Sequence, residues 1–260
     1  MHLKALNWYK NLSQSRHRRS ESLFLVEGKR AVEQILALKA DFVVEILISK
    51  DHYPEHFNNY TVRRIEHVQM KKICTASTPQ GVAAVVRIPQ DTYSCLLPQQ
   101  IGTRILLLEH VQDPGNVGTL IRTAAALGYD GCLLSDKCAD PFSPKSIQST
   151  AGSVLSVWIR RSDRYMEMLT ELKEKHFTLV AAGLGGTEVI DFSNFTKHVI
   201  ALGSEGSGLS SDLLTLCDSV FRIPMVQGAA ESLNVGASGA ICMFMGAQGL
   251  MLQKNDLKQE

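Results

Sequence analysis

Short apolar runs alternate with longer amphipathic stretches along the whole chain. In the first ninety residues, an apolar run at 24–26 leads into a stretch in which Ala31, Ile35 and Leu38 share one helical face. Further strands are predicted at 43–48, 61–66 and 81–89, with a helical pattern at 67–74. This alternation predicts a small α/β domain that ends near Pro89.

A second α/β pattern begins after a stretch with little periodicity, which predicts a linker at 91–102. The strand at 104–110 is so uniformly apolar that both faces of its sheet must be covered. More strands are predicted at 131–135, 177–183, 198–205 and 219–224, separated by helical stretches. The pattern is typical of a mostly parallel sheet with helices on both sides.

Ligands of such sheets bind at the carboxyl ends of the strands, so the segments after those strands are candidates for chemistry. The segment 113–128 predicts a turn and then a helix that Asn116 can cap. Arg122 lies off the apolar face of that helix. A helix N-terminus with an arginine one turn in suits a phosphate or carboxylate, although a capped helix with a solvated arginine is the simpler alternative.

The loop "GSEGSGLS" at 203–210 has the glycine spacing of a phosphate-binding loop, but Leu209 stands where the lysine belongs. Glu205 would also repel a polyphosphate. Backbone donors beside a carboxylate favour a cation or a hydroxyl-rich ligand that carries positive charge, whereas the alternative is a tight glycine turn without ligand.

A third segment, 223–238, follows another strand and supplies Ser232 and Asn234, which taken alone would be helix-capping residues. The helix predicted from about Leu233 consists almost wholly of small or apolar residues. It can therefore pack very closely, as helices at subunit interfaces do.

Charge is unevenly distributed along the 260 residues, although the net charge is only +1. Residues 1–90 hold 14 Lys and Arg against 8 Asp and Glu, and the remainder holds 13 against 18. This asymmetry indicates a polyanionic partner for the first part only, with an ordinary mixed surface as the alternative. The first twenty residues are basic and lack acidic residues, which we interpret as a basic N-terminal arm (1–20) of a cytoplasmic protein rather than a transit peptide.

Neither a metal site nor a membrane span is predicted. The six cysteines form no C-x-x-C pair, so reduced thiols fit better than zinc ligation or disulfides. His52 and His56 have the spacing of helical metal ligands, but Pro54 between them disfavours a helix. The longest apolar stretch, 235–252, is interrupted by Ser238 and Gln248 and reads as a buried helix.

Taken together and in this order, "DPGNVGTLIRTAAALG", "LGSEGSGLS" and "IPMVQGAAESLNVGAS" resemble the three signature motifs of the SpoU (TrmH) family of RNA ribose methyltransferases. This family belongs to the SPOUT superfamily, and the resemblance implies a SPOUT methyltransferase domain at 103–253. The first part, with "FLVEGKRAVEQIL" and "TPQGVAAVV", resembles an L30e-like RNA substrate-binding domain, placed at 21–90.

The resemblance implies that S-adenosylmethionine binds in a deep trefoil knot, and that the protein is a homodimer with the knots at its interface. It implies a catalytic set of Asn116, Arg122, Glu205, Ser232 and Asn234. It implies cofactor contacts from Ala182, Leu202, Gly203, Gly208, Ile223, Met225 and Leu233.

Within that set, we interpret Arg122 as a bidentate clamp on the phosphate beside the target ribose. A guanidinium pKa above about 12 makes arginine a poor base at neutral pH. Asn116 and Ser232 would then orient the 2′-hydroxyl.

The basic first part is expected to hold RNA phosphates. The candidate RNA contacts are Arg16, Arg18, Arg19, Lys29, Arg30 and Lys145. The segment 143–154 resembles a family segment that often has a basic residue where Gln148 stands, a departure for which Lys145 can compensate.

The function implied is methylation of a ribose 2′-hydroxyl in RNA, with ribosomal RNA favoured over transfer RNA. A non-catalytic RNA-binding protein that retains the fold is the main rival, but it would have a damaged glycine loop or no Arg122. A nucleotide hydrolase is disfavoured by Leu209.

Overall fold

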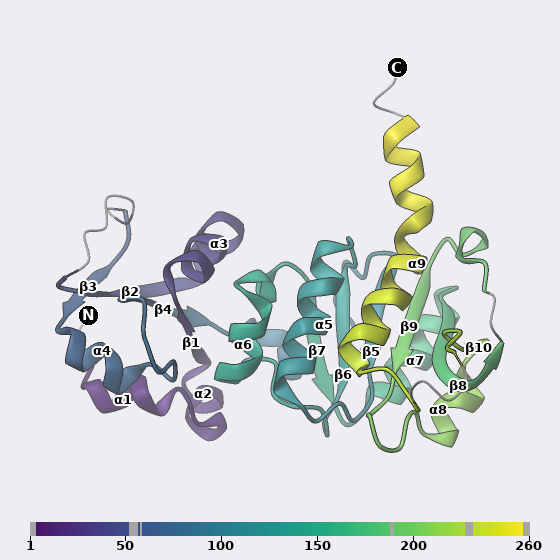
Figure 1. Cartoon of the computed structure of the whole chain (residues 1–260), viewed down its shortest axis with the longest axis horizontal. Coiled ribbons are helices and arrows are strands. Elements are labelled where there is room, and N and C mark those ends of the chain that lie inside the picture. The colour runs from purple at the N-terminus through teal and green to yellow at the C-terminus, as the bar shows by residue number, and fades with distance from the viewer. Residues whose placement is uncertain (1–3, 52–56, 58, 188–189, 227–230, 257–260) are drawn as a thin grey trace. The chain divides into compact units, whose positions relative to one another are not determined.

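The computed structural model describes residues 4–51, 57, 59–187, 190–226 and 231–256 (Figure 1). Contacts between residues divide the chain into two compact units. Unit 1 comprises Met1–Gln90 and Asp140–Ser156, and unit 2 comprises Asp91–Ala139 and Val157–Glu260. The first division therefore falls close to Pro89, but unit 1 also includes a segment from the middle of the chain.

Unit 1 is built on a four-stranded sheet in the order β1-β4-β2-β3, formed by β1 (Leu23–Glu27), β4 (Val82–Arg87), β2 (Val43–Ser49) and β3 (Val62–Ile65). β4 pairs antiparallel with both β1 and β2, and β2 pairs parallel with β3. The helices α3 (Lys29–Lys39) and α4 (His67–Ile73) follow β1 and β3. The predicted alternation of strands and helices is present in this unit.

The N-terminal residues form two helices, α1 (Leu6–Asn11) and α2 (Ser15–Glu21), that belong to unit 1. Tyr9 and Leu12 are each 1% exposed and pack in one core cluster with Leu47 and Met70. The Tyr9 hydroxyl also donates to the Glu45 carboxylate at 2.6 Å. The expectation of a separate basic arm at 1–20 was therefore wrong, because two apolar side chains anchor this segment in a core.

The segment 140–156 contributes α6 (Pro144–Thr150) and a 3₁₀ turn, η3 (Ser153–Leu155), to unit 1. Phe142 packs against Phe24 of β1 with ring centroids 4.9 Å apart. Gly152 has a φ of +93°, and a Cβ there would lie 2.6 Å from the Ala31 carbonyl oxygen of α3. Only glycine therefore fits where η3 meets α3. The sequence pattern did not predict α6.

Unit 2 contains a six-stranded sheet in the order β10-β8-β9-β5-β6-β7, in which all the strand pairs are parallel. Its strands are β5 (Arg104–Leu108), β6 (Gly131–Ser135), β7 (Trp158–Ser162), β8 (Thr178–Thr187), β9 (His198–Leu202) and β10 (Ser219–Phe221). The predicted parallel sheet is confirmed. β7 was not predicted, because its sequence "WIRRS" contains two arginines.

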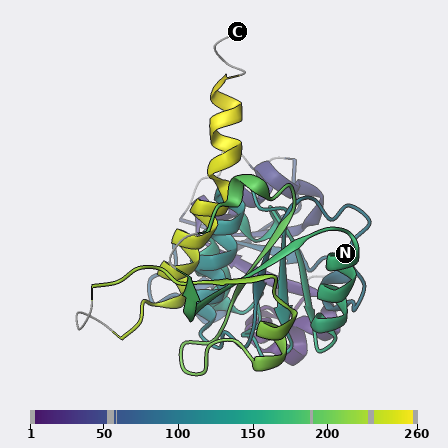
Figure 2. The ribbon, with the colours of Figure 1, turned by 90° about the vertical axis from the view of Figure 1, so that its right-hand side faces the viewer.

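Helices cover both faces of this sheet. On one face, Ile105 and Leu107 of β5 pack in a cluster with α7 (Tyr165–Glu174) and with Leu213 of α8 (Ser211–Leu216). On the other face lie α5 (Pro114–Ala126) and α9 (Val235–Asp256), which are side by side in Figures 1 and 2. A Cβ at Gly239 of α9 would lie 2.2 Å from Leu120 Cδ2 of α5, so the small residues of α9 permit this close packing. Because the strands are parallel, their carboxyl ends meet at one edge.

Candidate functional site

The glycine loop is a closed turn that follows β9 at the carboxyl edge of the unit 2 sheet. Ser204 and Gly208 exchange two backbone hydrogen bonds, at 3.2 and 3.0 Å. Gly208 has a φ of +66°, and a Cβ at Gly203 would lie 2.2 Å from the Gly208 carbonyl carbon. Only glycine therefore fits at position 203, and the backbone of position 208 favours glycine, so the loop presents backbone rather than bulky side chains.

A cavity of about 540 Å³ opens beside this loop. Its walls come from the loop, the end of β8, and the segments before and at the start of α9. Val220 of β10 pairs with Ala181 of β8, but the next residue, Phe221, pairs with Thr187. The glycine-rich residues 182–186 of β8 therefore form a bulge that has no partners in β10. The cavity lining includes these residues of the predicted site: Ala182, Leu202, Gly203, Glu205, Gly208, Ile223, Met225, Ser232 and Leu233.

Three polar side chains from three separate motifs form a hydrogen-bonded chain beside the cavity. The Asn116 side-chain nitrogen donates to Glu205 Oε1 at 2.5 Å, and Asn116 Oδ1 accepts from the Asn234 side chain at 3.2 Å. Asn234 Oδ1 in turn accepts from the Gly236 N–H at 2.8 Å and so caps α9. Both amides thus use one donor or acceptor toward each neighbour, which orients the Asn116 and Asn234 side chains relative to Glu205.

The cap of α5 differs from the expected one. Asp113 is the N-cap, and its carboxylate accepts from the Asn116 backbone N–H at 2.9 Å. The Asn116 side chain is therefore not needed as a cap and reaches Glu205 instead. The negative charge of the Asp113 carboxylate is also favourable at the positive end of the helix dipole, which an asparagine side chain in that place would not provide.

The structure does not bring Arg122 into this cluster. Arg122 is exposed on α5, six residues after Asn116, which is about 9 Å along the helix axis. Within the described parts of the chain, it neither lines the cavity nor forms a hydrogen bond. Ser232 is exposed at the cavity wall.

A buried carboxylate that sequence reasoning missed supports the end of the glycine loop. Glu109 follows β5 and is fully buried. It accepts from the Tyr165 hydroxyl at 2.5 Å and from the backbone N–H and hydroxyl of Ser210 at 2.6 and 2.7 Å. Burial, together with the Glu109 hydrogen bond, raises the pKa of Tyr165. The sequence did contain a signal for this role, namely an acidic residue directly after the apolar run "ILLL". A carboxylate at the end of a buried strand is itself buried and needs hydrogen-bond donors.

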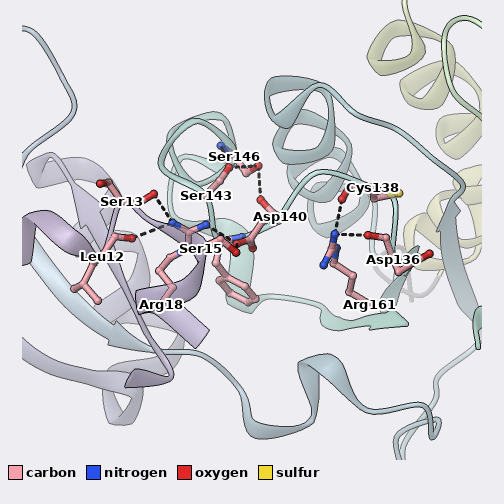
Figure 3. Close-up of polar contacts among 11 residues, drawn as sticks. Leu12, Ser13, Ser15, Arg18, Asp136, Cys138, Asp140, Ser143, Ser146 and Arg161 are labelled. Carbon is pink, nitrogen blue, oxygen red and sulfur yellow. Dashed lines mark hydrogen bonds and ion pairs between the residues drawn. The ribbon is translucent and has the colours of Figure 1, made fainter. Parts of the chain in front are cut away.

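Five of the six predicted RNA contacts are exposed, namely Arg16, Arg19, Lys29, Arg30 and Lys145. Arg18 is 2% exposed, and the prediction that it contacts RNA was wrong. Its guanidinium donates to the carbonyls of Leu12 and Ser13 and pairs with Asp140 at 2.5 Å (Figure 3). Arg18 therefore holds the start of the 140–156 segment within unit 1 and has no surface to offer a phosphate.

The two arginines of β7 donate hydrogen bonds to backbone carbonyls of unit 2. Arg160 is 5% exposed and donates to the Leu96 carbonyl at 2.9 Å. Arg161 donates to the carbonyls of Asp136 and Cys138 (Figure 3). These contacts explain how two charged residues lie in a strand of a covered sheet.

Within the described residues, no group of three or more His, Cys, Asp or Glu side chains is placed to hold a metal ion. His52 and His56 lie outside the residues that the structure describes. The six cysteines are free thiols. Of the helices in the described ranges, none is long and apolar enough to cross a bilayer.

Comparison with known proteins gives two domain matches. The SpoU rRNA Methylase family matches residues 103–244, and the MRM3-like substrate binding domain matches residues 5–84. The 23S rRNA (guanosine(2553)-2′-O)-methyltransferase RlmP of Bacillus subtilis is 30% identical, over 93% of this chain and 94% of its own. The 23S rRNA (uridine(2479)-2′-O)-methyltransferase of Streptomyces viridochromogenes is 31% identical, over 64% of this chain and 59% of its own.

Solved structures of similar proteins cover nearly the whole chain. An rRNA methyltransferase from Sinorhizobium meliloti with bound AdoMet superposes with a TM-score of 0.78 at 27% identity and covers 94% of each chain. A TrmH-family RNA methyltransferase from Porphyromonas gingivalis, described as putative, superposes with a TM-score of 0.79 at 28% identity. It covers 95% of this chain and 98% of its own.

Proposed function

Because the chain belongs to the SpoU rRNA methylase family, we propose that it methylates a ribose 2′-hydroxyl of ribosomal RNA with S-adenosylmethionine as the methyl donor. The observation that carries this proposal is the cavity at the carboxyl edge of the sheet, which unites the glycine loop with the segment before α9. The relatives that act on the 2′-hydroxyl of 23S ribosomal RNA support the substrate.

The residues of the cavity fit this methyl donor. Gly203 and Gly208 let a ligand lie against backbone, while Val220 and Leu233 give apolar walls. Leu209 also lines the cavity, so the loop lacks the ammonium that would bind a triphosphate. The cofactor supplies an electrophilic methyl group on a positively charged sulfur, and the Glu205 carboxylate gives the cavity a matching negative charge.

The task of the protein residues is to align the ribose hydroxyl with the methyl group and to help its proton leave. The hydrogen-bonded chain Glu205–Asn116–Asn234 is already formed before substrate binds, so little conformational entropy is lost on binding. We assign Asn116 and Ser232 to orientation of the hydroxyl. Arg122 is assigned to the phosphate next to the target ribose, since a guanidinium binds phosphate in a bidentate manner.

A homodimer is part of the proposal. α9 exposes Ile241 and Phe244, at 40% and 46%, on a helix that is otherwise rich in small residues. A second subunit at this helix would cover both side chains and could bring its Arg122 to the site. Sedimentation velocity that gives only a monomer at micromolar concentration would contradict the homodimer.

We also propose a trefoil knot in the C-terminal part of the chain and action in the cytoplasm.

The test is to map ribose methylation in cellular RNA with and without this protein. We expect one 2′-O-methyl group to disappear from large-subunit ribosomal RNA and to return with the wild-type chain. It should not return with Gly203→Val, whose side chain would collide with Gly208. Loss of a methyl group from transfer RNA instead would reassign the substrate.

Calorimetry on the purified protein tests the cofactor independently. We expect S-adenosylmethionine to bind and ATP not to bind. The reverse result would refute the proposed methyltransferase activity.

A further inference from the structure

Unit 1 contains a second cavity, of about 420 Å³, that shares no lining residue with the first. It is formed by the end of β1, the first turn of α3, the loop 74–80 and α6. All of these segments belong to unit 1. The cavity therefore depends on the return of the 140–156 segment to this unit.

The wall formed by the loop is rigidly held. The Glu27 carboxylate accepts three hydrogen bonds, from the Thr75 N–H at 2.8 Å, the Thr75 hydroxyl at 2.9 Å and the Ala76 N–H at 3.1 Å. Both Glu27 oxygens are thus occupied by the loop, which limits the repulsion that this charge would exert on an anion. These bonds hold the loop against the end of β1.

The opposite wall brings backbone close to the cavity. Gly28 has a φ of +95°, and a Cβ there would lie 3.0 Å from Gln80 Oε1. Gly28 is also the N-cap of α3 and has no side chain to cap the helix. The N-cap residue therefore adds no side-chain oxygen at this wall, and the chain of Gly28 lies close to Gln80.

The lining combines an apolar floor with neutral polar groups at the rim. Val82 and Ile147 are buried at the floor, while the amides of Gln80 and Gln148 are exposed. A side-chain amide offers a donor and an acceptor side by side, which is the pattern that the edge of a nucleobase presents. Apolar surface suits the two faces of a base.

The surroundings carry positive charge. Arg30 lines the cavity, is exposed, and forms no hydrogen bond or ion pair with any other residue that the structure describes. Its neighbour Lys29 instead pairs with Glu33 at 3.8 Å. Lys71 and Lys72 are exposed in the last turn of α4, just before the loop. This charge complements the phosphates of a polynucleotide.

We propose that this cavity binds one unpaired base of the substrate RNA, with Gln148 on the edge of the base and Arg30 on an adjacent phosphate. The proposal rests on the proposed function in that RNA is the partner. It also gives Gln148 a role: a neutral amide can distinguish bases, whereas a lysine or arginine at this position would chiefly bind phosphate. The cavity would thereby contribute to the choice of RNA.

The experiment measures binding of the full-length protein to 5′-labelled RNA hexamers by fluorescence anisotropy, without S-adenosylmethionine. The probes are the four homohexamers and a hexamer of ribose phosphates without bases. We expect the wild type to bind at least one homohexamer about fivefold or more tightly than the abasic probe. Gln148→Ala should reduce that ratio to within about twofold.

Arg30→Ala should weaken binding of all probes by a similar factor and reduce its salt dependence, because it removes a phosphate contact. Two control variants keep the cavity intact. Gln100→Ala removes an exposed amide from unit 2, and Lys39→Ala removes an exposed charge from the far end of α3. Both should bind like the wild type in their base preference.

A Gln148→Ala protein that is folded by circular dichroism and keeps the full base preference would overturn the proposal. Hydrogen exchange supplies a measurement that needs no variant: the preferred hexamer should protect residues 74–80 and 144–151 more than the abasic probe, and equal protection would also overturn the proposal. Neither readout involves methyl transfer. Base-dependent binding in a protein that methylates no RNA would therefore uphold this cavity and reject the proposed activity.

Discussion

Asn116 lies near the start of α5, where the carboxylate of Asp113 already holds its backbone N–H. Its side chain is therefore available to join Glu205 and Asn234. The same residue type at the same position could have been a helix cap, as we had expected. Which role it takes depends on a neighbour three residues earlier and on two partners about ninety and one hundred and twenty residues later.

Arg122→Ala tests the proposed phosphate clamp at this scale. We expect kcat/KM for RNA methylation to fall by about a hundredfold or more, because a bidentate contact to a phosphate is lost. Affinity for S-adenosylmethionine should stay within about tenfold, since Arg122 does not line the cavity. Arg122→Lys is the matched variant and should retain part of the activity. A fully active alanine variant would remove Arg122 from the mechanism.

At the scale of elements, the glycine loop is fixed at both ends by strands of the central sheet. It starts from β9, and at its far end Ser210 is held by the buried carboxylate that follows β5. Ser210 is also the N-cap of α8. One carboxylate thus positions the loop, the helix after it and, through Tyr165, the helix α7.

Glu109→Gln should weaken the hydrogen bonds that hold Ser210 and Tyr165. The amide is nearly isosteric with the carboxylate, but its NH₂ group would face hydrogen-bond donors. We expect affinity for S-adenosylmethionine to fall by about tenfold and the free energy of unfolding to fall by about 1–3 kcal/mol. Tyr165→Phe removes one donor only and should have a smaller effect on affinity. Calorimetry and thermal unfolding measure the two quantities. A loss of stability with unchanged affinity would show that Glu109 does not position the loop.

At the scale of the whole molecule, the two units are not two consecutive stretches of chain. The segment 140–156 returns to unit 1 between strands of unit 2, and the ion pair of Arg18 with Asp140 holds its start. Unit 2 contains a buried polar cluster between β9 and α9. His198 of β9 is 2% exposed and lies 3.3 Å from the Tyr129 hydroxyl, beneath Gly246 of α9.

The stability of the protein should therefore decrease in mild acid. Burial, and then the charge of Arg104, lowers the pKa of His198 to about 4 from 6.5. Between these values the unfolded chain binds a proton that the folded chain does not, so stability is full above pH 6.5 and is lost as the pH falls toward 4. The loss amounts to about 3 kcal/mol.

Denaturant unfolding at a series of pH values between 4.5 and 8 measures this loss. His198→Gln should flatten the pH dependence, even if it lowers stability at every pH. His176→Asn is the control, because His176 is exposed with a φ of +64° that asparagine adopts readily. An unchanged slope in His198→Gln would show that this histidine does not titrate with unfolding.

The sequence by itself determined the alternation of strands and helices, the parallel sheet of unit 2 and the loops that line the first cavity. These features follow from local patterns: apolar strands such as 104–108 must be covered, and closely spaced glycines such as Gly203 and Gly208 mark a tight loop that approaches a ligand with its backbone. The order of the three motifs added the family resemblance.

The tertiary structure alone decided the roles of polar side chains and the course of the chain between units. Arg18, Glu109 and Arg160 look like solvated charges in the sequence, yet in the fold they are buried against partners that are distant in sequence. The return of 140–156 to unit 1 was missed for the same reason, because no local pattern shows a contact with residues more than a hundred positions away. α6 itself has a local signal, the N-cap Ser143 followed by Pro144. Burial of a charge depends on its partners, and partners are brought together only by folding.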